Sequence, residues 1–558
     1  MDNSLRFNVT DERPRYCGKH DTYPFNENRI WEFNHRHDAI LERYHLSLKS
    51  AEAVCLSDKL NSRSNLGALR NRKLRESAVL AAGLAAIAVG LHGRGSAAKL
   101  PKEERTKQMM NLLKRDNDRT AALAMAEVLQ TTSMTLPVGE EVVIESTITE
   151  GVRVKPGKEL GGNPTIAVGA LFGKEEHRHI YGLPMKHNVS LLSMGNDVID
   201  GTTKSVKGEH SSLTALFLTE SNVKRHLPDV YIQRWMSGSY FDLFNPRSVP
   251  LEEQAEIIAK SYNDGTKLEN LSAFFLDRNR HHYAMDKLNK AGVATPWDKD
   301  GDLFPSLVLG NDLVDFPNGR KLNSFIGEIG GSAEWAVGVL PLVWRGGQAI
   351  GMMTSQSALT RKDLSPEQKW KERFHFTEEE FMAIQDARFE HKPYFTIFDI
   401  LEEPFAGGIA CFGGITDNMF LPEMEGVSSS AADNTVTVNV LSTNSLGLTE
   451  LWKLTFACTD GLEKTVDAFL PPKQRLINLK GKDLESAIGR VLDDPVLRER
   501  YRIFFNNEYY PALIPVREKM VLLHRAIEGL IARGALADID REIVETTLKL
   551  ASEWFVND

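Results

Sequence analysis

Residues 196–203, NDVIDGTT, decide the fold of this chain. They follow directly on residues 189–194 (VSLLSM), a short apolar run that predicts a buried strand. Asp197 and Asp200 therefore stand three residues apart at the end of a strand, where two carboxylates and a Gly-Thr step can bind divalent cations and face a phosphate. The alternative is an Asx-turn in which Asp200 caps a helix.

The sequence on both sides of this motif alternates short apolar runs, turns and helical patterns. Helices are expected at residues 75–91 and 119–130 because their apolar residues recur at helical spacing. Other expected strands are residues 141–146 (EVVIES), 272–276 (SAFFL), 324–329 (SFIGEI) and 408–412 (GIACF). Several end next to Gly or Asp, a pattern typical of an α/β sandwich with polar groups at strand ends.

Composition narrows the function classes. The 558 residues are 42% hydrophobic and 26% charged, with a net charge of −9, which argues against a basic nucleic-acid platform. Residues 78–91 form an apolar run shorter than the roughly 20 residues of a membrane span, so a buried helix is expected, with no membrane association. Four cysteines without CxxC spacing and a polar start without a secretory signal predict a reducing, cytoplasmic location.

Three segments are expected along the chain. Residues 1–70 form an N-terminal extension, with a polar helix near residues 37–60. Residues 71–460 form the α/β sandwich, which carries a charged helical insertion near residues 360–392. Residues 461–558 form a helical C-terminal extension, because the strand signals stop near Asp460 and the apolar spacing becomes three and four.

NDVIDGTT resembles the DPxDGT signature of the lithium-sensitive, metal-dependent sugar and inositol phosphatase superfamily. The order of the other segments, from about Leu74 to Cys458, resembles the class II fructose-1,6-bisphosphatases within it. The resemblance implies a layered αβαβα sandwich, Mg²⁺ or Mn²⁺ as cofactor, and a homo-oligomer. It implies no nucleic-acid partner.

The resemblance also implies a set of metal ligands from separate segments. They are Asp118 before an Ala-rich helix, Glu145 in VVIEST, Asp197 and Asp200, and Glu334 in GGSAE. Lys114 precedes Asp118 by one helical turn and would meet phosphate, whereas the residues alone favour a surface ion pair between the two. Glu334 falls in the first turn of a helix, where a capping acid is the alternative.

Substrate contacts follow from three further segments. The resemblance assigns them to Tyr231 in PDVY, Arg278 and Arg280 in LDRNRH, and Asp300 and Asp302 in a DGD step that also reads as a plain turn. An arginine such as Arg280 can bind a phosphate dianion in a bidentate manner.

The chain departs from the family at the proton acceptor. Thr147 and Thr149 stand where the family has a Glu and then an Asp, and a threonine is no general base near neutral pH. Thr202 is expected to orient the attacking water, and the adjacent Glu150 is the candidate substitute for the missing base.

The resemblance implies a hydrolase of carbohydrate metabolism, a phosphoric monoester hydrolase. Its substrate is expected to be a sugar phosphate, most simply the 1-phosphate of fructose 1,6-bisphosphate. Two alternatives stay open: a weakly active or inactive relative that binds a phosphosugar or a protein, and a phosphatase for another phosphorylated polyol. The sequence does not choose the sugar, the metal, the pathway or the role of the extensions.

Overall fold

The fold was analysed on a computed structural model. It describes residues 5–9, 15–16, 21–23, 37–57, 69, 72–150, 165–166, 170–174, 177, 189–225, 227–228, 230–262, 267–309, 314–316 and 320–469. The helices expected beyond Asp460 lie outside these residues, apart from α14 (Leu462–Ala468).

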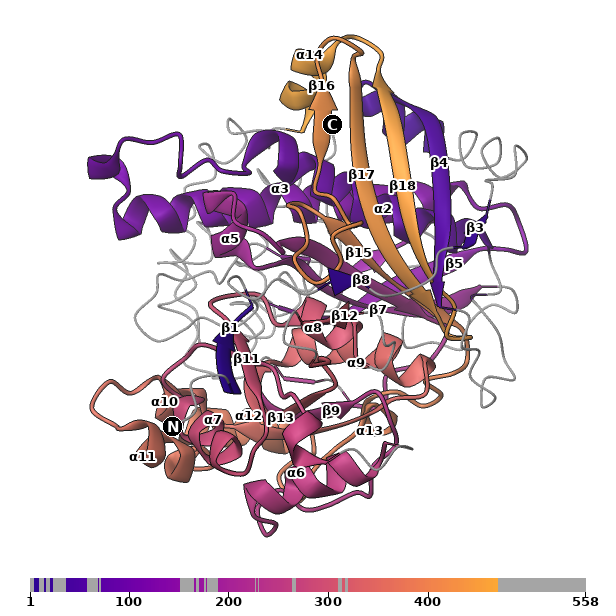
Figure 1. The fold of residues 1–558 in the computed structure, drawn as a ribbon. Helices are drawn as coiled ribbons and strands as arrows, with labels where there is room; N and C mark the ends of the chain where they lie inside the picture. The colour runs from indigo at the N-terminus through magenta and orange to yellow at the C-terminus, as the bar shows by residue number, and fades with distance from the viewer. Residues whose placement is uncertain are drawn as a thin grey trace, which may run out of the picture.

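A ten-stranded mixed sheet forms the upper layer (Figure 1). Along its main path the strands follow the order β3 (Asp21–Tyr23), β4 (Leu46–Ser57), β18 (Thr449–Cys458), β17 (Thr435–Asn444), β15 (Gly408–Gly414), β8 (Leu213–Thr219), β7 (Ser190–Asp200), β5 (Val142–Thr149) and β6 (Leu171–Phe172), and β16 (Ser428–Ser430) pairs with β17. Strands β5 and β7 are parallel, and β7 and β8 are antiparallel. The carboxyl ends of β5 and β7 therefore meet at one edge of the sheet.

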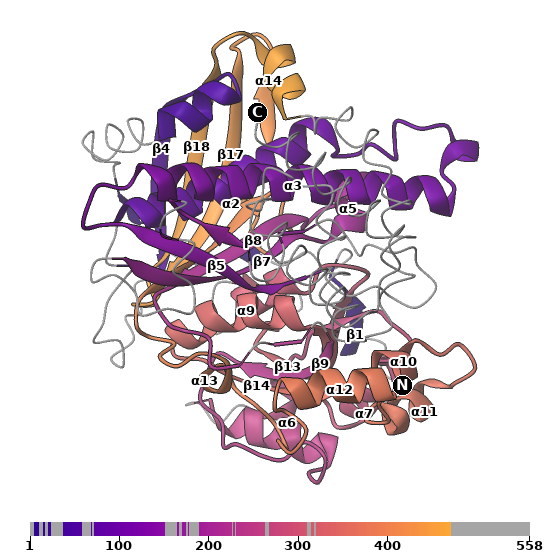
Figure 2. The ribbon, with the colours of Figure 1, turned by 180° about the vertical axis from the view of Figure 1, so that it is seen from behind.

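Helices α2 (Arg72–His92) and α3 (Lys107–Thr135) cover the outer face of this sheet (Figure 2). Helix α2 is long and apolar enough to cross a membrane by length and composition, but 83% of its most apolar window is buried inside the protein. It packs with α3 and with the sheet in one hydrophobic core. The helix expected at residues 75–91 is thus observed, extended by three residues at its N-terminal end and by one at its C-terminal end.

The opposite face of the large sheet packs on α8 (Leu303–Leu307) and α9 (Ser332–Trp344) through a second core. Beneath α9 lies a smaller sheet, β13 (Ser324–Gly331), β9 (Tyr231–Ser237) and β14 (Gln348–Thr354), in that order (Figure 2). A third core joins this sheet to α6 (Leu251–Lys260) and α7 (His282–Lys290). The layers are helix, sheet, helix, sheet and helix, so the predicted αβαβα sandwich is confirmed.

Two minor sheets complete the lower half. β11 (Thr295–Asp298) pairs in parallel with β1 (Arg6–Asn8) and β10 (Phe275–Leu276), and β12 (Val314–Asp315) pairs with β2 (Arg15–Tyr16). The remaining helices are α5 (Thr202–Lys207), α10 (Gln356–Thr360), α11 (Pro366–Glu372), α12 (Glu378–Asp386) and α13 (Ile397–Ile400), with 3-10 turns η2 (Lys102–Glu104) and η3 (Leu268–Asn270). Helices α11 and α12 lie in the stretch predicted as a charged insertion, which is helical as expected.

The expected helix at residues 37–60 is wrong in its second half. Residues 37–43 are helical, but β4 follows and pairs with β18 along its whole length. Burial alternates residue by residue through much of β4, with Leu46, Leu48, Ala51 and Ala53 buried, as in a strand with one covered face. The described parts of the N-terminal segment thus contribute strands to three sheets of the sandwich.

Candidate active site

The motif NDVIDGTT spans the end of β7 and the start of α5. The β7–β8 ladder is irregular between Asp197 and Asp200, and both carboxylates are buried. Asp197 Oδ1 accepts a hydrogen bond from the backbone of Ile199 at 3.2 Å, so the Asx-turn is present. Gly201, with φ of +75°, is the N-cap of α5, so the alternative role of Asp200 as that cap does not hold. Asp200 instead accepts from the backbone of Leu303 at 3.2 Å.

Seven carboxylates surround this strand end, and we call them the acidic group: Asp118, Glu150, Asp197, Asp200, Asp300, Asp302 and Glu334. Burial raises the pKa of Asp197, and the charges of Glu150, Glu334, Asp200 and Asp118 raise it further. The pKa values of Asp200 and Glu334 are also raised, first by burial and next by Asp302. Their mutual repulsion shows that these acids lie within electrostatic reach of one another.

Few positive charges offset this group. Arg278 pairs with Asp300 and Arg234 with Asp302. Lys204, the cation that acts on Asp200, instead forms a buried ion pair with Asp298 at 2.5 Å. Glu334 Oε2 is buried and accepts no hydrogen bond from any described residue. Hard oxygen donors with too little positive charge suit a divalent cation. Among the described residues, however, no three acidic, His or Cys side chains converge closely enough to hold a metal ion. The residue types therefore fit a metal, but their side chains would have to move closer together to bind it.

Asp118 reaches the acidic group from α3. It is buried and accepts a hydrogen bond from Thr202 Oγ1 at 3.3 Å, while Asn117 of the same helix donates to Ser205 Oγ at 2.7 Å and ties α3 to α5. The surface ion pair considered for Lys114 and Asp118 is absent from the described residues. Lys114 is half-buried one helical turn before Asp118, on the same face.

The structure does not bring Glu145 to the acidic group. Glu145 pairs with Ser193 in the β5–β7 ladder, four residues before Asp197, and at about 3.3 Å per residue this separates the two backbones by about 13 Å. A bulge at Thr147 shifts the register, so that Thr149 pairs with Asn196 and the next residue, Glu150, lies level with Asp197. Glu150 is accordingly the acid of this segment that raises the pKa of Asp197.

The two threonines expected at the proton-acceptor position point elsewhere. Thr147 Oγ1 donates to the carbonyl of Met194 at 2.9 Å, and Thr149 Oγ1 donates to the carbonyl of Ile166 at 2.8 Å. Thr149 also accepts from Asn196 Nδ2 at 2.9 Å. Both hydroxyls therefore hold the strand end together.

Glu334 enters from the first turn of α9, as expected. The helix begins after Gly331, which forms no side-chain cap, so the capping-box alternative is not observed. A β-carbon at Gly331 would lie 2.1 Å from Glu334 Oε2. A side chain at this position would force the Glu334 carboxylate to move.

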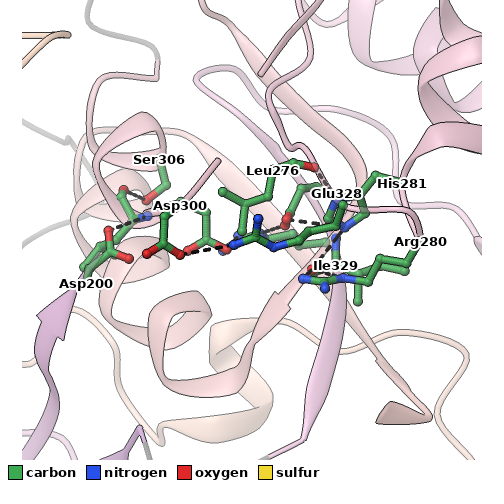
Figure 3. A network of polar contacts seen from close by, with 12 residues as sticks. Asp200, Leu276, Arg280, His281, Asp300, Ser306, Glu328 and Ile329 are labelled. Carbon is green, nitrogen blue, oxygen red and sulfur yellow. Dashed lines mark hydrogen bonds and ion pairs between the residues drawn. The ribbon is translucent and has the colours of Figure 1, made fainter. Parts of the chain in front are cut away.

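The predicted substrate-binding residues lie in and beside a network of polar contacts around the starts of α7, α8 and β9, part of which Figure 3 shows. Arg278 Nη2 lies 3.2 Å from Asp300 Oδ1, and Asp302 pairs with Arg234. The Arg280 guanidinium lies 4.7 Å from the ring centre of Tyr231 and donates two hydrogen bonds to the carbonyl of Ile329. Figure 3 shows Asp200 and Arg280 at opposite ends of this network, which separates an anionic end from a cationic end.

Sequence reasoning missed the buried ions between these ends. Arg234 on β9 is fully buried, pairs with Asp302, and donates from Nε to Glu328 at 2.5 Å. A β-carbon at Gly330 would lie 2.5 Å from Asp302 Oδ2 and 2.6 Å from Arg234 Nη2, so this glycine makes room for the pair. The available signal was a charged residue inside each of two apolar strands, YIQRWMS and SFIGEIGG.

A five-layered α/β sandwich with buried acids at strand and helix ends, facing a row of arginines, has the architecture of a sugar phosphatase. The chain matches the family described as bacterial fructose-1,6-bisphosphatase, glpX-encoded, over residues 105–445, more than half of its length, and it belongs to that family.

Three characterised relatives carry related names. A D-fructose 1,6-bisphosphatase class 2/sedoheptulose 1,7-bisphosphatase of Synechococcus sp. (strain JA-3-3Ab) is 26% identical over 151 residues, which cover 27% of this chain and 41% of that relative. A second Synechococcus strain has a protein of the same name with the same identity and coverage. A class 2 fructose-1,6-bisphosphatase of Haemophilus influenzae is 26% identical over 118 residues, 21% of this chain and 35% of its own. The chain thus aligns with about two fifths or less of each relative.

Proposed function

We propose that this protein hydrolyses a phosphate monoester of a phosphorylated sugar and that it requires a divalent cation, Mg²⁺ or Mn²⁺. The observation that carries the proposal is the buried, cation-poor acidic group at the carboxyl ends of β5 and β7. The family match and the names of the relatives support a bisphosphate substrate such as fructose 1,6-bisphosphate.

Asp118, Glu150, Asp197, Asp200 and Glu334 would hold the cations, with Glu150 in the place expected for Glu145. Divalent cations bound in this way offset the charge on a phosphoryl group and activate water. Two further residues act on the reacting groups. Thr202 donates its proton to Asp118 or to the carbonyl of Ile199, so its oxygen is left to accept from a water and orient it. Lys114 would offset charge on the phosphoryl oxygens.

Glu150 is the candidate proton acceptor as well. Its backbone nitrogen donates to the carbonyl of Asn196 at 3.3 Å, which holds the residue beside the end of β7. Its carboxylate is half-buried and lies within electrostatic reach of Asp197 and Glu334. A positioned carboxylate contributes about 10²–10⁴-fold as a general base. The chain can therefore supply this function without an aspartate at position 149.

The substrate would lie along the network of Figure 3, with the reacting phosphate at the acidic group. Asp300 and Asp302 would accept hydrogen bonds from sugar hydroxyls. Tyr231, Arg278 and Arg280 would contact the far end of the molecule, where a second phosphate of a bisphosphate would lie. Arg234 positions Asp302, because the two form a buried ion pair.

The test is phosphate release from a panel of sugar mono- and bisphosphates and inositol phosphates, with Mg²⁺ and Mn²⁺ supplied separately. Metal-dependent release from a bisphosphate, abolished in Asp197→Asn, is the expected result. Release from none of these esters by a folded protein that still binds them would favour the alternative of a non-catalytic phosphosugar-binding relative. Phosphate release from an inositol phosphate alone would show that the substrate is a phosphorylated polyol of that kind and no sugar phosphate.

Two accessory properties complete the proposal. We expect a cytoplasmic location, since Cys411 and Cys458 are buried free thiols. We also expect a homo-oligomer, which size-exclusion chromatography with light scattering would test.

A further inference from the structure

Helix α11, in the charged insertion, buries a lysine. Its single buried residue is Lys369, whose exposed fraction is 6%. A short surface helix ordinarily buries an apolar side chain, and lysine is among the residues least often buried without a partner. Lys369 therefore needs an explanation from its surroundings.

Those surroundings contain the cationic end of the proposed substrate network. Helix α11 lies beside α7 in both overall views (Figures 1 and 2), and the rings of Trp370 and Tyr283 are 5.8 Å apart. Trp370 also packs on β13, since its ring lies 3.0 Å from where a β-carbon of Gly327 would stand. Arg280 comes just before α7 and donates to Ile329 of β13. The packing of α11 thus places Lys369 on a helix that contacts α7 and β13, the two elements beside Arg280.

The electrostatics agree with this placement. Burial lowers the pKa of the Lys369 ammonium, and the positive charge of Arg280 lowers it further. Asp363 raises this pKa, but its carboxylate already forms two hydrogen bonds with Arg361. The positive charges of Lys369 and Arg280 therefore act on each other across the contact between α11 and α7.

Neither cation has an acidic partner among the residues that the structure describes. Lys369 forms no hydrogen bond or ion pair there through its ammonium group. Arg280 donates only to a backbone carbonyl and stacks over the ring of Tyr231. Glu328, the acid that acts on Arg280 from β13, is already held by Arg234. Two neighbouring cations without an acidic partner repel each other, and an anion that binds between them removes that repulsion.

We propose that Lys369 and Arg280 together bind a phosphate group, so that the charged insertion completes the site for the distal phosphate of a bisphosphate substrate. The assignment of the bound group to a substrate rests on the proposed function. The assignment of an anion site does not. A phosphate dianion matches the two positive charges, and arginine and lysine are the side chains that most often bind it.

The first experiment measures binding of inorganic phosphate to the whole chain without metal, by titration calorimetry in EDTA. Without metal the acidic group repels phosphate, so binding reports on the cationic end. Lys369→Met should weaken phosphate binding by about 10- to 100-fold, the range for a charge-assisted hydrogen bond. Lys369→Arg should retain binding. The matched control is Lys371→Met, which removes an exposed lysine of the same helix that pairs with Glu367 at 2.8 Å.

The second experiment separates this inference from the proposed function. In steady-state assays, Lys369→Met should raise KM for fructose 1,6-bisphosphate while kcat and the KM for a monophosphate stay near wild type. An active enzyme whose KM for the bisphosphate is unchanged in Lys369→Met overturns the inference and leaves the proposed function standing. Phosphate binding that depends on Lys369 in a protein without any hydrolytic activity supports the inference and overturns the function.

Two binding results overturn the inference directly. One is the absence of phosphate binding by the wild-type chain. The other is equal phosphate affinity in wild type and in a Lys369→Met variant whose thermal unfolding shows it to be folded.

Discussion

Glu328 offers a test of the buried ions that connect the two ends of the site. Its carboxylate is fully buried in β13, and Arg234 donates to it at 2.5 Å. Burial raises the pKa of Glu328 from 4.5 to about 7, and Arg234 offsets only part of that increase because Asp302 adds a second negative charge. The folded protein thus holds a proton on Glu328 at a pH where the unfolded chain has lost it.

This difference makes stability depend on pH in a definite direction. Below pH 4.5 the carboxyl is protonated in both the folded and the unfolded state, so it does not lower the free energy of unfolding. As pH rises from 4.5 to 7 the unfolded state loses the proton first, so the free energy of unfolding falls. A shift from 4.5 to about 7 corresponds to a loss of about 3 kcal/mol by pH 8, since each pKa unit is worth about 1.4 kcal/mol.

Glu328→Gln should remove this dependence. Glutamine has nearly the same shape, still accepts from Arg234 Nε, and has no proton to lose. Urea unfolding in EDTA at pH 5 and pH 8 gives the free energy of unfolding at each pH. Between these values, wild type should lose about 2–3 kcal/mol more than Glu328→Gln. The comparison cancels the titration of the other acids, which both proteins share.

The matched control is Glu403→Gln, which neutralises an exposed glutamate outside the network. Its pH dependence should run parallel to that of wild type. If Glu328→Gln also runs parallel to wild type, Glu328 is not a buried carboxyl with a raised pKa, and the arrangement around Arg234 is wrong.

Four other outcomes follow from the site. Asp197→Asn should lower kcat/KM by at least about 100-fold and weaken Mn²⁺ binding with an unchanged circular dichroism spectrum. Normal turnover in this variant would show that NDVIDGTT is only a turn and binds no catalytic metal. Glu150→Gln should lower kcat by about 10²–10⁴-fold, while Glu145→Gln should leave kcat near wild type. A large loss in Glu145→Gln and none in Glu150→Gln would show that Glu145 is the acid of the site, as the sequence predicted. Gly331→Ala should weaken Mn²⁺ binding in a calorimetric titration, because a β-carbon there would lie 2.1 Å from a carboxylate oxygen of the acidic group; unchanged affinity would show that this oxygen can move aside at no cost. Lys369→Met should raise Tm by about 2–4 °C in calorimetry, since it removes a positive charge that repels Arg280, whereas a lower Tm would point to a partner for the ammonium.

The sequence alone determined the features that depend on local pattern. The apolar run at residues 78–91 predicts a buried helix, and α2 is one. NDVIDGTT predicts two carboxylates at a strand end, and Asp197 and Asp200 lie at the end of β7. The sequence predicts a strand followed by a glycine turn and a helix because all three signals fall within about fifteen residues. The order of such segments also predicted the layered architecture.

The missed strand β4 shows where local pattern was read with the wrong period. Residues 46–57 alternate between buried and exposed positions through much of their length, as in a strand, whereas a polar helix was expected there. Its partner β18 lies about 400 residues later in the chain. Pairing with a distant strand outweighed local propensity there.

Only the tertiary structure decided which acid of β5 belongs to the site. Glu145 and Glu150 are both plausible in the sequence, but a one-residue bulge at Thr147 sets the register of β5 against β7 and brings Glu150 level with Asp197. The Arg234–Glu328 pair and the approach of Lys369 to Arg280 likewise join strands and helices that are far apart in the chain. Such contacts depend on ladder register and on helix packing, and neither is encoded by the spacing of residues within one segment.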